Sequence, residues 1–136
     1  MIRPVVRDIF FLSQRSEEAS AEDISIGQDL RDTLRAHREH CIGMAANMIG
    51  YLKRIIIVDT PAGDMLMFDP VITKRSGPYE TEEGCLSLDG VRKTLRYREI
   101  ETEFYDERFK KHRMRFSGLT AQAVQHEIDH LDGMII

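Results

Sequence analysis

Two histidines near the C-terminal end of the sequence have the spacing of a metal site. His126 and His130 lie four residues apart in HEIDH, with Glu127 directly after the first. Residues four apart project from one face of a helix, so both imidazoles can reach one ion. Glu127 lies about 100° around the helix axis, where it can approach a water on that ion. The pattern therefore predicts the geometry of a metal-dependent hydrolase.

A catalytic metal site needs a third protein ligand and one position left open for water. Only six residues follow His130, so the third ligand is expected upstream. Cys85 is the favoured candidate, because EEGCLSLDG surrounds its thiol with glycines, a serine and carboxylates in place of apolar neighbours. Cys41 and His112 are weaker candidates: CIGMAANMIG is typical of tight apolar packing, and KKHRMR of an exposed basic loop.

The helix that carries the histidines has predictable ends. Ser117 or Thr120 can cap its start, and Gly133 suits its C-terminal stop. Its buried stripe is predicted to consist of Ala121, Val124, Ile128 and Leu131.

Elements upstream must supply the core on which this helix packs. A first helix is predicted over 21–38, since Ser20 can cap it and apolar residues recur at helical spacing after it. RIIIVD (54–59) and MLMFDPVI (65–72) are apolar and β-branched, and TPAGD between them is typical of a turn. We expect two strands here.

A second pair of strands is expected further along. EIETEFYD alternates, with Ile100, Thr102 and Phe104 on one side, and DERFKK has the composition of a hairpin loop before HRMRF. Strands between helices without strict alternation indicate an α+β fold, with mixed or antiparallel strands packed around the C-terminal helix. A length of 136 residues, 42% of them hydrophobic, suits a single domain over 1–136.

Composition argues against several classes of protein. The charged residues are mixed in sign and the net charge of -4 forms no block, which disfavours nucleic acid and anionic membrane surfaces. The N-terminal apolar patch is short and interrupted by Arg and Asp, so it predicts neither a signal peptide nor a membrane span. A cytoplasmic protein is expected. In that reducing compartment Cys41 and Cys85 should be thiols or metal ligands.

Three segments, GMAANMIG, EGCLS and HEIDH, resemble the signature motifs of the peptide deformylase family and occur in the family's order. The resemblance implies that Cys85, His126 and His130 bind one divalent ion, in the family usually Fe²⁺, with Zn²⁺, Ni²⁺ or Co²⁺ as substitutes. It also implies the reaction, which is removal of the formyl group from N-formyl-methionine at the start of nascent bacterial or organellar chains.

The resemblance assigns further roles around the metal. Glu127 would take a proton from water and return it to the departing amine. The backbone N–H of Leu86 would donate a hydrogen bond to the developing oxyanion. The implied substrate-binding positions are Ile42, Gly43, Met48, Gly84 and Arg92.

Met48 departs from the family pattern GxGxAAxQxG, in which this position is glutamine. A thioether cannot donate a hydrogen bond, and losing one oxyanion donor typically costs about 2.7 to 4 kcal/mol. Asn47 carries an amide, but neighbouring side chains usually point apart. Met48 therefore leaves open a weakened or altered-specificity deformylase-like metalloprotein and a metal-binding protein without catalysis. A small HExxH metallopeptidase is a third alternative, because it would share the histidine helix.

The expected partner is a formyl-methionyl peptide, with no nucleic acid or membrane. Family members commonly extend beyond the last motif with a segment that helps docking near the ribosome exit. The short stretch after His130 leaves a ribosome contact of this kind open.

Overall fold

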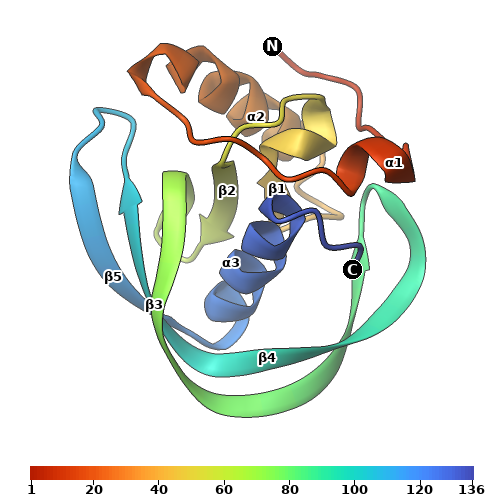
Figure 1. Cartoon of the computed structure of the whole chain (residues 1–136), viewed down its shortest axis with the longest axis vertical. Coiled ribbons are helices and arrows are strands. Elements are labelled where there is room, and N and C mark those ends of the chain that lie inside the picture. Colours follow the sequence, from red (N-terminus) through yellow and green to blue (C-terminus); the bar gives the residue numbers. More distant parts are fainter.

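The computed structural model describes residues 1–136 and has the α+β architecture predicted from the sequence (Figure 1). One antiparallel sheet with the strand order β1-β2-β3-β4-β5 is packed against helices. None of the helices is long and apolar enough to cross a membrane. The elements are α1 (Ile9–Leu12), the 3-10 helix η1 (Ala21–Asp23), α2 (Ile24–Ala36), β1 (Gly43–Ala45), the 3-10 helix η2 (Ala46–Ile49), β2 (Ile55–Thr60), β3 (Gly63–Cys85), β4 (Leu88–Tyr105), β5 (Lys111–Ser117) and α3 (Gly118–Leu131).

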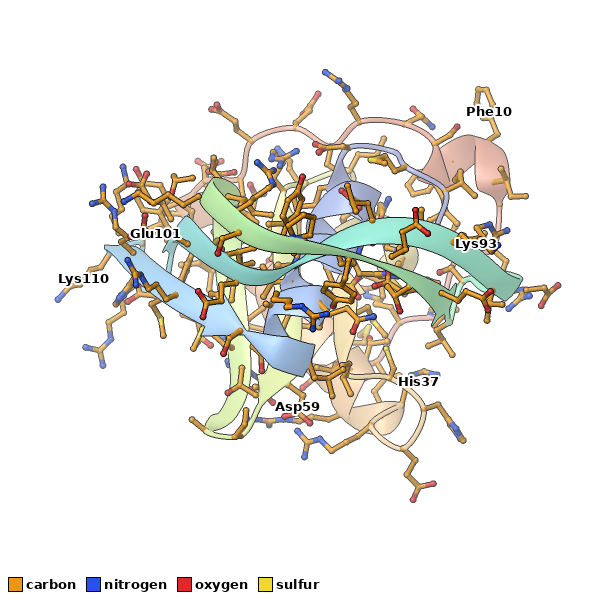
Figure 2. All side chains as sticks on the ribbon, turned by 90° about the horizontal axis from the view of Figure 1, so that it is seen from below. Phe10, His37, Asp59, Lys93, Glu101 and Lys110 are labelled. Carbon is orange, nitrogen blue, oxygen red and sulfur yellow. The ribbon has the colours of Figure 1, made fainter.

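The long β3–β4 hairpin determines the shape of the molecule, because it curls around α3 (Figure 1). Its pairing runs from Phe68 opposite Tyr105 to Cys85 opposite Leu88, with three register shifts on the way. Such bulges bend a strand and increase its twist. The curl brings the hairpin tip beside α1 and the side of α3. In the view from below, Lys93 near this tip and Lys110 in the β4–β5 turn lie at opposite ends of the molecule (Figure 2).

The core lies between the sheet and the two longer helices. Strand β2 contacts both α2 and α3, and its residues 55–58 are fully buried, so both of its faces are covered. On α3 the predicted stripe is buried as expected, with Ala121, Val124, Ile128 and Leu131 each at most 7% exposed. The alternation predicted for β4 is also confirmed, since Ile100, Thr102 and Phe104 all point into the core.

The predicted first helix is confirmed, although it opens with the single 3-10 turn η1. The Ser20 hydroxyl accepts a hydrogen bond from the Glu22 N–H at 3.3 Å, and the Ser20 N–H donates to the Asp23 carboxylate at 2.9 Å. This is the reciprocal cap that the sequence predicts. The helix ends at Ala36, two residues before the predicted end.

The strand predicted over 65–72 is real but continues to Cys85, and the short elements β1 and η2 were not predicted. Residues 73–78 are exposed on both faces of the strand, so no alternation of apolar and polar residues marks them. Strand β1 has only three residues, which is too few for any period to be visible.

The end of α3 is fixed as the sequence predicts. Gly133 has a φ of 79°, in the left-handed region. Its N–H donates to the His130 carbonyl and the Met134 N–H donates to the Asp129 carbonyl, both at 3.0 Å, which is a Schellman motif. At the other end Ser117 is the cap residue, but its side chain makes no capping hydrogen bond.

Candidate functional site

The structure brings Cys85, His126 and His130 together. Cys85 is the last residue of β3, and the two histidines lie one turn apart on the buried side of α3. The ligand atoms of the three residues all lie within 4.8 Å of one another, and the two histidine Nε2 atoms are 3.0 Å apart. The weaker candidates do not join this cluster, since the His112 Nε2 contacts Asp106 at the surface. The three residues could therefore hold one metal ion.

The donor set fits a divalent cation. Two imidazole nitrogens that face each other at 3.0 Å need a proton or a cation between them. Burial opposes a charge on His126, but interactions with Cys85 and Glu83 outweigh it and raise the pKa of His126 to about 10. Burial and the charge of His126 lower the pKa of His130 to about 3, which leaves a lone pair free to bind metal. The cluster therefore favours a bound cation between the two histidine nitrogens and the cysteine sulfur.

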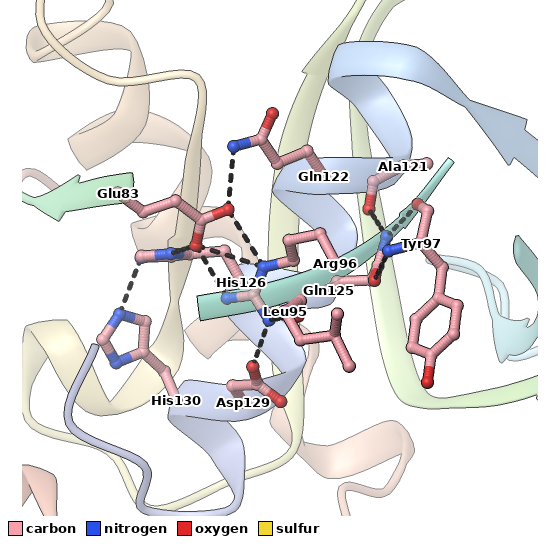
Figure 3. Close-up of polar contacts among 10 residues, drawn as sticks. All are labelled: Glu83, Leu95, Arg96, Tyr97, Ala121, Gln122, Gln125, His126, Asp129 and His130. Carbon is pink, nitrogen blue, oxygen red and sulfur yellow. Dashed lines mark hydrogen bonds and ion pairs between the residues drawn. The ribbon is translucent and has the colours of Figure 1, made fainter. Parts of the chain in front are cut away.

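A buried carboxylate orients the first histidine (Figure 3). Glu83 accepts hydrogen bonds from the His126 Nδ1 at 2.7 Å, the Gln122 Nε2 at 2.8 Å and the Arg96 guanidinium at 2.7 Å and 2.9 Å. Burial alone would raise the pKa of Glu83, but these hydrogen bonds lower it to about 2. The carboxylate fixes the His126 ring so that its Nε2 faces Cys85 and His130.

Arg96 links this carboxylate to the metal-site helix. Its side chain is 4% exposed, and its Nη1 also donates to the Asp129 carboxylate at 2.6 Å. Gln125 adds a second link between α3 and β4, because its side-chain amide exchanges two hydrogen bonds with the Tyr97 backbone, at 2.8 and 2.9 Å (Figure 3).

These supporting residues were not predicted from the sequence. Glu83 belongs to the EGCLS segment, which is the one signal that could have identified it. No pattern in the sequence marks Arg96. In the β3–β4 pairing Glu83 lies opposite Arg92, and Arg96 lies opposite Tyr79. Arg96 therefore reaches Glu83 only because the hairpin curls.

Glu127 is buried beside the cluster, with its Oε1 lacking any hydrogen-bond partner. A Cβ atom on Gly43 would lie 3.0 Å from the Glu127 Oε2, so glycine allows β1 to approach this carboxyl closely. Burial is the main cause that raises the pKa of Glu127, to about 7. A carboxyl group with such a pKa can both accept and return a proton near neutral pH.

A cavity of about 750 Å³ opens above the cluster. Cys85, His126 and Glu127 line it, together with most of the predicted substrate-binding and catalytic positions. These are Ile42, Gly43, Met48, Gly84 and Leu86. Arg92 does not line the cavity, and its guanidinium donates to the Asp89 carbonyl at 3.2 Å.

The cavity wall from the first motif offers no side-chain amide. Met48 is 1% exposed, and its sulfur accepts a hydrogen bond from the Ala45 N–H at 3.4 Å. Asn47 points elsewhere, since its Nδ2 donates to the His130 carbonyl at 2.9 Å. Asn47 therefore fixes the end of α3 and does not replace a donor at position 48.

The fold and site are those of a known family of enzymes. Residues 7–136 match the family model of polypeptide deformylase, and the chain belongs to this family. A peptide deformylase from Clostridium beijerinckii is 54% identical over 100% of both chains. A peptide deformylase from Pelotomaculum thermopropionicum is 44% identical over 69% of this chain and 61% of that protein. A solved class I type b peptide deformylase from Acinetobacter baumannii has a TM-score of 0.89 and 27% identity, covering 99% of this chain and 97% of that one.

Proposed function

We propose that the chain is a peptide deformylase, a metal-dependent hydrolase that removes the formyl group from N-formyl-methionine at the start of nascent polypeptides and releases formate. The match to a deformylase at 54% identity over the full length of both chains is the observation that carries this proposal. The site supports it, because Cys85, His126 and Glu127 line one cavity and the buried His130 completes the group of three candidate ligands. The cytoplasm, where nascent chains are made, is the proposed location.

Cys85, His126 and His130 are the proposed ligands of one divalent ion. Fe²⁺ is the proposed native ion, and Zn²⁺, Ni²⁺ or Co²⁺ suit the same sulfur and nitrogen donors. When bound, the ion supplies a Lewis acid that polarises a carbonyl and makes water a nucleophile near neutral pH.

Residues of the chain carry out the remaining steps. Glu127 takes a proton from the attacking water as the bond to the formyl carbon forms, and gives it to the nitrogen as the carbon–nitrogen bond breaks. The products are formate and a free amine. The Leu86 N–H donates to the formyl oxygen as that atom becomes negative. Ile42, Gly43 and Gly84 provide the walls that hold the formyl-methionine.

A weakened or altered-specificity deformylase-like metalloprotein is the second candidate. Met48 favours it, because the cavity holds a thioether where the family pattern has an amide, and Asn47 is turned away. One of two oxyanion donors would then be missing, which corresponds to on the order of a hundred- to a thousandfold in rate. Nothing in the structure favours a metallopeptidase.

Formate release from formyl-Met-Ala-amide by protein loaded anaerobically with Fe²⁺ tests the proposal. The parent should release formate, and should not cleave the unformylated or acetylated peptide. Glu127→Gln should keep its metal but lose most activity, because an amide cannot move the proton. Metal binding without formate release would identify a non-catalytic metalloprotein, and cleavage of the unformylated peptide would indicate a peptidase.

A further inference from the structure

Arg7 lies at the mouth of the cavity, although no motif marks it. Its side chain lines the cavity and is 55% exposed. The Nη1 atom donates to the Leu86 carbonyl at 3.2 Å, and the Nη2 atom pairs with the Asp89 carboxylate at 2.6 Å. The guanidinium thus forms part of the cavity wall and reaches the segment that follows Cys85 through two solvent-exposed contacts.

The segment that carries Arg7 is tied down on the other side of the cavity. The Val6 N–H donates to the Met48 carbonyl at 2.7 Å. Further back, the Arg3 N–H donates to the Thr33 hydroxyl at 2.9 Å. The backbone of this segment is therefore held by α2 and η2, and the Arg7 side chain crosses from the first motif to the second. Such anchoring reduces the entropy that an arginine loses when it binds a ligand.

Arg7 and Arg92 hold the same turn but differ in what they face. Arg92 donates to the Asp89 carbonyl at 3.2 Å and does not line the cavity. Arg7 pairs with the Asp89 side chain and does line it. An arginine that contacts substrate must reach the cavity, and of these two only Arg7 does.

We propose that Arg7 is a substrate-binding residue, which donates hydrogen bonds to a backbone carbonyl of the peptide downstream of formyl-methionine. A guanidinium has five N–H groups, and Arg7 uses two of them within the protein, so donors remain for a ligand. Any peptide longer than the formylated residue must leave the cavity through its mouth, where Arg7 lies. This inference rests on the proposed function, and it assigns to Arg7 the contact that the sequence predicted for Arg92.

Peptides of increasing length distinguish a substrate contact of Arg7 from a purely structural role. Formyl-Met-amide, formyl-Met-Ala-amide and formyl-Met-Ala-Ser-amide are suitable, since amidation removes a terminal carboxylate that would attract any arginine. Arg7→Ala should raise KM about tenfold for the longer peptides, as expected for a hydrogen bond to a charged donor, and leave formyl-Met-amide unchanged. Arg7→Lys should recover part of the loss. Lys93→Ala is the matched control, because it removes an exposed positive charge from the same end of the hairpin outside the cavity.

A binding measurement keeps this test independent of turnover. Calorimetry with zinc-loaded protein and Met-Ala-Ser-amide should give a roughly tenfold weaker affinity for Arg7→Ala than for the parent or for Lys93→Ala. If the parent releases no formate, the proposed function fails and this affinity alone decides the role of Arg7. Equal losses in Arg7→Ala at every peptide length, or equal affinities in all three proteins, would overturn the inference and leave Arg7 as a support of the turn.

Discussion

Replacement of Glu83 by glutamine should separate the stability of the protein from its affinity for metal. The Glu83 carboxylate is 7% exposed and contacts both the Arg96 guanidinium and the His126 imidazole. Glutamine has almost the same shape but carries no charge. The buried Arg96 guanidinium therefore has less negative charge beside it. The hydrogen bond that orients the His126 ring also becomes weaker.

The size of the stability loss depends on the ion pair that Arg96 retains. Breaking a buried ion pair by removing one partner typically costs about 3 to 5 kcal/mol. Arg96 keeps the Asp129 carboxylate at 2.6 Å, so the lower end, about 3 kcal/mol, applies to Glu83→Gln. For a chain of this size such a loss lowers Tm by about 10 °C. Loss of a partner that orients a metal-binding histidine typically weakens metal affinity by about ten- to a hundredfold.

Urea unfolding of metal-free protein measures the free energy of unfolding, and competition with a chelator for Zn²⁺ measures the metal affinity. Asp129→Asn is the matched control, because it also removes a carboxylate from Arg96 but does not touch His126. The control should lose stability and keep its zinc affinity within about twofold of the parent. Parental zinc affinity in Glu83→Gln would show that the carboxylate does not orient the histidine.

Three further predictions test the site and the fold. Cys85→Ala should lose stoichiometric metal while Cys41→Ala keeps it, as measured by elemental analysis, and the reverse result would mean that the wrong thiol was assigned. Met48→Gln should raise kcat on a formyl-Met peptide by up to the hundred- to thousandfold expected for one restored donor, at equal metal occupancy. An unchanged kcat would show that another donor already fills the place. Gly133→Ala should destabilise the protein by about 1 to 2 kcal/mol or more in urea unfolding, because its φ of 79° is left-handed and a Cβ would overlap the Ser13 carbonyl. Parental stability would mean that the end of α3 can shift.

The metal cluster was predictable because most of its information is local. The spacing of His126 and His130 depends only on the period of a helix, and the end of that helix depends on Gly133. Cys85 lies far away in the chain, yet its polar neighbours already distinguish it from a packing cysteine. For Cys41 the prediction is packing or a plain thiol. Its thiol is half-buried in the cavity wall outside the ligand group, and burial raises its pKa to about 12.

The parts that could not be predicted depend on long-range geometry. Arg96 meets Glu83 only because the hairpin curls, and no local pattern encodes the register shifts that produce the curl. Arg7 reaches the cavity from a segment without regular structure, so neither period nor motif marks it. The extension of β3 through residues 73–78 is hidden for a different reason: both of its faces are exposed, and alternation appears only where one face is buried.

The position of α3 at the end of the fold has a consequence for synthesis of the chain. A ribosome completes strands β2 to β5 before α3 emerges, and at that stage the curled hairpin lacks the helix that it encloses. The parts of β1, β2, β4 and β5 that contact α3 in the finished protein then lack their cover. Arrival of α3 closes this surface and delivers both histidines in the same event, so a chain that stalls after β5 should be prone to aggregation and lack two of the three candidate ligands.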